Sequence, residues 1–221
     1  MRNFKSNQVR EAIARTLGAK GERALEIELR IKRLIAADRK FGRRPKSSNV
    51  GERHYAFYDG ESLGTGADIL FTEFEAFALL AAILLLEHGL PQMTVVKLLR
   101  QVRHQLQDAH ADSLRKKPDK IFDEKVILAE ARPGMLAFET TEPVILVFAK
   151  LTGSSFDDPK AGAPVKICRS QLEMVEFMKQ HRHPGTALSI FEWAKLIHVL
   201  HSNLARSTPV SRGRASGMSE S

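Results

Sequence analysis

Four histidines in the last third of the chain come nearest, by type and spacing, to a metal site. They form the pairs His181-x-His183 and His198-x-x-His201, and Cys168 lies near them in sequence. Imidazoles three residues apart share one face of a helix, an arrangement that zinc sites can use. No CxxC or HExxH spacing accompanies these histidines, so we expect partly exposed side chains and no metal ligands.

Catalysis has no recognisable motif in this sequence. An α/β-hydrolase places its nucleophile in GxSxG, and nucleotide enzymes carry GxGxxG or a P-loop, but none of these motifs occurs. The adjacent carboxylates Asp157 and Asp158 stand in a stretch rich in Gly and Pro, which is typical of a solvated loop. We therefore predict a protein that is not an enzyme, with no catalytic residues and no cofactor.

The cationic side chains are concentrated at the start of the chain. Residues 1–50 contain fourteen Lys and Arg against five Asp and Glu, whereas residues 51–100 contain three against seven. Lys and Arg that bind phosphates release condensed counterions, so a basic block of this kind indicates nucleic-acid binding. The side chains that we expect to contact duplex DNA are Lys20, Arg23, Arg30, Lys32, Arg33, Arg39, Lys40, Arg43, Arg44 and Lys46.

Two more arginines, Arg212 and Arg214, flank a glycine near the end of the chain. The triplet resembles the core of an AT-hook, whose arginines enter a narrow A·T minor groove. Ala215 stands where an AT-hook has proline. We add both arginines to the predicted DNA-binding residues. Residues 206–221 are rich in Ser, Gly and Arg, which predicts a disordered tail.

Two helices are expected to carry the basic block. Ser6 can cap a helix over residues 6–16, and Gly18 ends it. A second helix begins near residue 22, with one apolar stripe of Ile27, Ile31, Leu34 and Ile35. A short glycine-containing turn joins the two helices, which makes them a helix-turn-helix candidate, and residues 41–53 have the composition of a loop.

A winged hairpin is expected next, formed by strands over residues 54–58 and 68–72 around a glycine-rich tip. Thr72 and Glu75 have the spacing of a capping box, which predicts an apolar helix over 73–88 that Gly89 and Pro91 close. A further helix is predicted from Thr94 to about Ala109. Its expected outward-facing side chains are Lys97, Arg100, Arg103 and His104.

The pattern changes after a polar join at residues 112–120. Short apolar runs predict a small antiparallel sheet; they cover residues 126–129, 135–138, 143–148 and 165–168. Ser170 starts a predicted helix to about residue 180, and a Ser189–Glu192 capping box predicts another over 190–204. The expected fold is α+β and predominantly helical. Its expected units are a DNA-binding unit at 1–112, a small α+β unit for sensing, interaction or dimerisation at 113–205, and a tail at 206–221.

The order of elements over residues 7–103 resembles the winged helix-turn-helix of the MerR-type transcription regulators. The matching positions are Phe71-Thr72, Leu79, Leu85, Gly89, Val96 and Leu98-Leu99-Arg100. The resemblance implies a dimeric regulator with Arg23, Arg30 and Arg33 in the major groove. Two features depart from that family: the second helix is longer, and the wing tip carries acidic residues, namely Asp59, Glu61 and Asp68.

The longest apolar run, residues 76–86, is shorter than the roughly 20 residues of a membrane span. No signal-peptide pattern opens the chain, so we expect a cytoplasmic protein. Either the chain itself covers the apolar run, or a second copy does so in a homodimer. The predicted function is a non-catalytic DNA-binding transcriptional regulator. The alternative is a protein-interaction adaptor that uses helix 73–88 and the C-terminal helices, with RNA or no nucleic acid.

Overall fold

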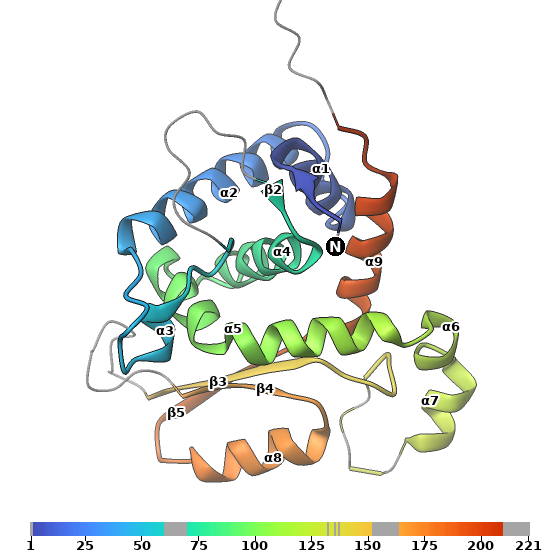
Figure 1. Cartoon of the computed structure of the whole chain (residues 1–221). Coiled ribbons are helices and arrows are strands. Elements are labelled where there is room, and N and C mark those ends of the chain that lie inside the picture. Colours follow the sequence, from blue (N-terminus) through green and yellow to red (C-terminus); the bar gives the residue numbers. More distant parts are fainter. Residues whose placement is uncertain are drawn as a thin grey trace, which may run out of the picture.

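A computed structural model describes residues 2–59, 70–131, 133–134, 136, 138–151 and 164–209. The fold is α+β and mostly helical, with two small antiparallel sheets, as expected from the sequence (Figure 1). The predicted tail from residue 210 onward, including Arg212 and Arg214, lies outside the described residues. Within the described part, no helix is long and apolar enough to cross a membrane.

Helix α4 (Glu73–Glu87) forms the centre of the molecule. The Thr72–Glu75 capping box is confirmed: the Glu75 amide donates to Thr72 Oγ1, and the Thr72 amide donates to the Glu75 carboxylate. Residues 74–83 and Leu85 are buried, and the helix contacts α1, α2, α5 and α9 of the same chain. The chain itself therefore covers most of the apolar run, in which Leu84 and Leu86 are partly buried.

Helices α1 (Ser6–Thr16) and α2 (Glu22–Phe41) lie beside α4, and a turn with Gly18 and Gly21 joins them. The apolar stripe of α2 is buried as predicted. Ser6 is not the cap of α1, because Lys5 takes that position and its amide donates to the Gln8 side chain. Strand β1 (Phe4–Lys5) pairs with β2 (Leu70–Phe71).

The prediction of the first wing strand is wrong. Residues 54–58 form no strand, and β2 pairs with β1 instead, while the wing tip lies outside the described residues. Within the predicted loop at 41–53, a one-turn helix, α3 (Val50–Arg53), is present. The physical reason is that side chains satisfy the backbone of residues 54–59: Asp38 accepts from the Ala56 amide, and Arg103 donates to the Ala56 carbonyl.

Helix α5 (Gln92–Arg115) is longer than predicted. It begins after Pro91, which caps α5 rather than closing α4, and Thr94 lies inside the helix. The expected unit boundary at residue 112 falls within α5. The prediction that Arg100 and Arg103 face outward is wrong, because both side chains are buried.

A three-stranded antiparallel sheet lies against α5, in the order β4 (Val165–Cys168), β3 (Ile145–Leu151), β5 (Thr186–Glu192). Strand β3 is apolar on both faces: Leu146 and Phe148 belong to the main core, whereas Ile145 and Val147 pack in a second cluster with α8 (Gln171–Gln180). Figure 1 shows α5 above the sheet and α8 below it. The prediction of a small antiparallel sheet followed by a helix from Ser170 is confirmed.

Other predictions for this region are wrong. Residues 126–129 belong to a helix, α7 (Glu124–Glu130), which follows α6 (Pro118–Ile121) and begins at an Asp123 cap. Residues 136 and 138 lie in no strand. The Ser189–Glu192 pair starts no helix, because its residues are in β5 and α9 (Ala194–Arg206) begins after Trp193. The Glu192 carboxylate instead accepts from the amides of Val144 and Ala194, at the corner between strand and helix.

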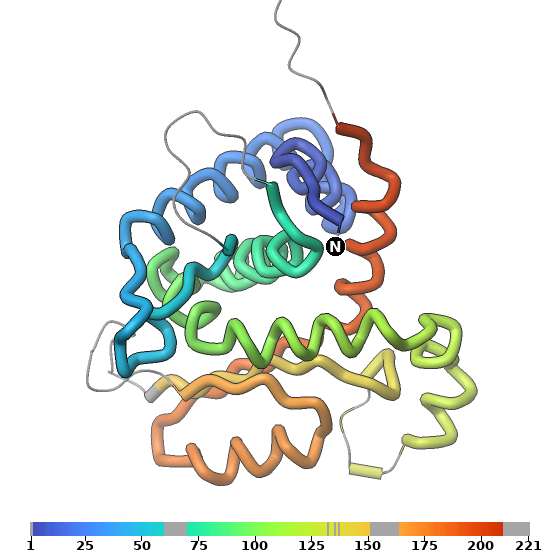
Figure 2. Tube along the Cα trace, viewed as in Figure 1, coloured from blue at the N-terminus to red at the C-terminus, as the bar shows by residue number. Residues whose placement is uncertain are grey.

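The main hydrophobic core continues across the two expected units. It contains residues of α1, α2, α4 and α5 together with Leu146, Ile167, Trp193 and Leu200. Helix α9 runs back to the start of the chain, where Gln8 donates to the Ser207 carbonyl, and Figure 2 shows the N-terminus beside α9.

Candidate nucleic-acid interface

The cationic residues predicted to bind DNA do not form one continuous surface. Lys20 lies in the turn before α2 and Arg23 in its first turn, whereas Arg33, Arg39 and Lys40 stand in its second half. A helix of twenty residues is about 30 Å long, so the two groups are far apart. We define the basic surface as the second half of α2 and the turn after it, with Arg33, Arg39, Lys40, Arg43, Arg44 and Lys46.

Several cations near the start and middle of α2 are partly neutralised. Arg23 lies 3.5 Å from Glu87, Lys32 lies 2.8 Å from Glu28, and Arg30 pairs with Glu26. The same part of the helix exposes Leu25 and Leu29. The N-terminal half of α2 is therefore less cationic than its sequence indicates. Of the three arginines that the MerR resemblance implies for the major groove, Arg33 alone makes no ion pair with another described residue.

The basic surface, by contrast, is almost free of acidic partners. Among the described residues, Arg33, Arg39, Lys40, Arg43 and Lys46 make no ion pair, and Arg44 makes only a long one, 3.8 Å, to Glu52. The Arg44 side chain is 82% exposed. Cations at a helix C-terminus also interact favourably with the helix dipole, which lowers the cost of placing several of them together.

Two arginines of the basic surface lie over tyrosine rings. The Arg39 guanidinium lies 5.7 Å from the centre of the Tyr58 ring, and the Arg43 guanidinium lies 5.8 Å from that of Tyr55. The two tyrosines stack with their centres 4.4 Å apart and are buried. Cation–π contacts of this kind restrict both arginines before any ligand binds.

The turn after α2 is held in place by α3. The Arg44 amide donates to the Glu52 carbonyl at 2.6 Å, and the Ser47 hydroxyl donates to the Glu52 carboxylate at 2.9 Å. Arg53 donates from Nε to the Ser47 carbonyl at 2.7 Å. Gly42, with φ of +72°, supplies the left-handed turn out of α2. Arg44 and Lys46 therefore project from a defined turn.

A buried ion pair supports this turn from below. Arg100 of α5 donates from Nε to Asp38 Oδ1 at 2.6 Å and from its terminal nitrogens to the Gly42 carbonyl at 2.6 Å and the Asp38 carbonyl at 2.7 Å. Both side chains are fully buried. The other Asp38 oxygen accepts from the amides of Ala56 and Phe57. Burial raises the pKa of Asp38, and Arg100 opposes that shift.

Arg103 forms a second buried cluster one turn further along α5. It donates to the Ala56 carbonyl at 2.6 Å and to Asp59 at 2.8 Å, and its guanidinium lies 3.8 Å from the Glu75 carboxylate.

The sequence analysis did not predict that Arg100 and Arg103 are buried. One signal was available: Asp38 follows Ile27, Ile31 and Leu34 on the apolar stripe of α2, where a charged side chain requires a buried partner.

The histidines singled out in the sequence contact different groups. His198 Nε2 lies 3.3 Å from Ser113 Oγ, His201 lies 3.3 Å from the Glu73 carboxylate, and His181 lies against Phe177. Within the described ranges, no group of three or more His, Cys, Asp or Glu side chains is arranged to hold a metal ion.

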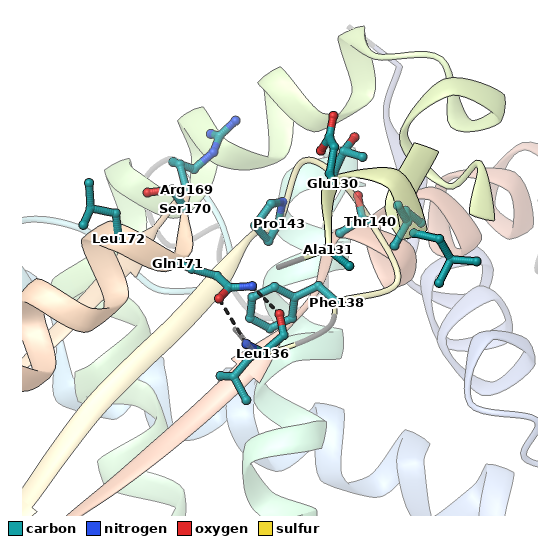
Figure 3. Close-up of a pocket in the computed structure, with 13 residues that line it drawn as sticks. Glu130, Ala131, Leu136, Phe138, Thr140, Pro143, Arg169, Ser170, Gln171 and Leu172 are labelled. Carbon is teal, nitrogen blue, oxygen red and sulfur yellow. Dashed lines mark hydrogen bonds between the residues drawn. The ribbon is translucent and has the colours of Figure 1, made fainter. Parts of the chain in front are cut away.

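An open apolar groove of about 350 Å³ lies between α7, residues 136–143 and the start of α8 (Figure 3). Leu128 and Leu172 line it and are 66% and 68% exposed. The Gln171 side chain bonds to both backbone groups of Leu136, which holds one wall in place. Of its charged lining residues, Arg169 lies 3.4 Å from Asp112, and the exposed leucines give the groove an apolar surface.

Comparisons with known protein families and curated proteins identify no relative of this chain. Neither a protein-family model nor a curated protein matches this chain. The MerR-type resemblance therefore rests only on the order of elements over residues 7–103, now without the first wing strand.

Proposed function

We propose that this protein is a non-catalytic DNA-binding regulator that contacts duplex phosphates through the basic surface. The observation that carries the proposal is the set of six cations at one end of α2, which have a single long ion pair among the described residues. Unpaired, exposed cations retain their full interaction with phosphates. In this proposal α1 and α2 act as a helix-turn-helix unit.

The same geometry favours contacts to phosphates over contacts to base edges. A recognition helix reads bases with residues near its N-terminus. In α2 that end exposes Leu25 and Leu29, and its arginines are engaged by Glu26 and Glu87. The cations stand instead at the C-terminal half and the following turn. Binding should therefore depend steeply on salt and weakly on sequence.

The adaptor alternative has less support at helix 73–88. Most apolar residues of α4 are buried against α1, α2, α5 and α9, and Leu84 and Leu86 are partly buried. The exposed leucines of the groove beside α8 remain as an apolar surface.

The test measures duplex binding by fluorescence anisotropy between about 50 and 200 mM salt. If all six cations contact phosphates, the slope of log K against log salt should be about −5, and affinity should fall about a thousandfold over this range. Replacing Arg33, Lys40, Arg44 and Lys46 by Gln should flatten the slope to about −2.

A charge-matched control replaces four exposed cations of the other part of the molecule, Lys120, Lys125, Lys179 and Arg182, by Gln. This control changes the net charge equally and should leave the slope unchanged. Equal effects of the two variants, or no binding at low salt, would contradict the proposal and direct attention to protein partners at the groove.

A further inference from the structure

His54 and His104 form an imidazole pair on the surface that neither the sequence motifs nor the proposed function includes. Their Nε2 atoms lie 3.0 Å apart, and the ring centres are 4.6 Å apart with the planes nearly perpendicular. Among the described residues neither imidazole bonds to any other group. One ring can donate its Nε2–H to the other, and when both rings carry their proton on Nδ1, each Nε2 atom has a free lone pair.

Both histidines are held by rigid elements. His104 lies on α5, and His54 is the residue that ends α3. Helix α3 packs closely on α5, since a Cβ built at Gly51 would lie 3.7 Å from the Gln101 amide nitrogen. Arg103, the neighbour of His104 on α5, donates to the Ala56 carbonyl at 2.6 Å. This bond holds the segment after His54 against α5.

We infer that His54 and His104 are a two-imidazole site for a Ni²⁺ or Cu²⁺ ion, with water completing the coordination. Imidazole nitrogens bind late first-row metals at roughly 2.0–2.1 Å. Two such bonds at a right angle place the nitrogens about 2.9 Å apart, and a tetrahedral angle places them about 3.3 Å apart. The separation of 3.0 Å matches the right-angle arrangement of Cu²⁺ and Ni²⁺ more closely than the tetrahedral arrangement of zinc.

The ring positions agree with a common ion. If each ring centre lies about 1.1 Å behind its Nε2 atom and both nitrogens face one ion, right-angle bonds place the centres about 4.5 Å apart. The measured 4.6 Å fits this geometry. Two rings in a straight N–H···N bond would have their centres about 5.2 Å apart, about 0.6 Å beyond the measured value.

The surroundings are cationic but compensated. Arg103 is paired with Asp59, and Arg53 donates to the carbonyls of Ser47 and Ser48. No third His, Cys, Asp or Glu ligand is available among the described residues, so the site is a two-ligand chelate open to solvent.

The test is calorimetric titration of the untagged full chain with Ni²⁺ at pH 7.5, alongside His54→Gln, His104→Gln and the control His88→Gln. His88 is also exposed, and its ring bonds to the Leu84 carbonyl. Loss of either member of the pair should weaken Ni²⁺ binding about a hundredfold, because the second imidazole binds at high effective concentration. The control should bind as tightly as the natural chain.

A second readout uses the paramagnetism of Ni²⁺. At substoichiometric metal, imidazole proton signals of His54 and His104 should broaden first, before those of the other histidines. Broadening spread equally over all exposed histidines, or full Ni²⁺ affinity in His104→Gln with its fold confirmed by circular dichroism, would overturn the inference. This site is independent of the proposed DNA binding, which the salt titration tests separately.

Discussion

The buried pair of Arg100 and Asp38 gives the sharpest prediction about stability. Arg100→Met keeps much of the side-chain volume but removes three hydrogen bonds, to Asp38 Oδ1, the Asp38 carbonyl and the Gly42 carbonyl. It leaves the Asp38 carboxylate fully buried, with two backbone amides as its donors. Removing one partner of such a pair costs about 3–5 kcal/mol of unfolding free energy.

Urea unfolding, followed by circular dichroism, measures this loss. The matched control is Arg30→Met, which breaks the surface ion pair between Arg30 and Glu26, one turn apart on α2. The side chains of that pair are 31% and 56% exposed. A pair of that kind contributes about 0.3–0.5 kcal/mol. The two variants make the same chemical change, so the difference between them isolates burial as the cause.

The double variant Asp38→Leu/Arg100→Met extends the test. Each single substitution leaves a lone buried charge, whereas the double one leaves none, so its loss should be smaller than the sum of the two single losses. A loss below about 1 kcal/mol for Arg100→Met, or strictly additive losses, would refute the reasoning that the pair is buried and coupled.

The remaining predictions concern single side chains. Thr72→Ala removes the cap that accepts from the Glu75 amide and should cost about 1 kcal/mol of unfolding free energy. Thr94→Val removes a buried hydroxyl that has no partner among the described residues and should be neutral or stabilising; urea unfolding distinguishes the two variants. Burial against Phe77, with smaller effects of His201 and His198, lowers the pKa of His110 to about 4, so the unfolded chain binds a proton between pH 6.5 and 4 that the folded chain does not. Stability should fall by about 3 kcal/mol as pH drops through this window, and His110→Phe should remove that part of the slope, as denaturation at several pH values would show. Burial raises the pKa of Cys168 to about 11, so a thiol reagent at pH 8 should modify it only as fast as the protein unfolds; rapid labelling of the folded chain would contradict its burial.

Local signals in the sequence predicted helix ends correctly where a capping residue or a glycine with positive φ starts or stops the helix. The Thr72–Glu75 capping box, the Ser170 cap and the positive-φ glycines at Gly18 and Gly89 all act within one turn of the chain. The same reasoning failed at residues 54–58 and 190–192. A short apolar run does not determine its own secondary structure, because the groups that hydrogen-bond to its backbone decide whether it forms a strand, a helix or neither.

The basic surface illustrates the same division between local and distant effects. Charge counting located the cations in residues 1–50, because net charge is a property of composition. It did not separate paired from unpaired cations, since Glu87 reaches Arg23 only after α4 packs against α2. The helical pattern after Thr94 likewise assigned Arg100 to the surface, although Asp38, sixty-two residues earlier, holds it in the core.

The sequence by itself therefore determined the mostly helical α+β class, the buried apolar helix and the cationic start of the chain. These follow from periodicity, capping and composition, which act over a few residues. Only the tertiary structure decided which arginines are buried, which cations remain unpaired, and that His54 and His104 meet. The burial of Arg100 and Arg103, the pairing of Arg23 with Glu87 and the contact of His54 with His104 depend on residues roughly fifty or more positions apart, which no local pattern encodes.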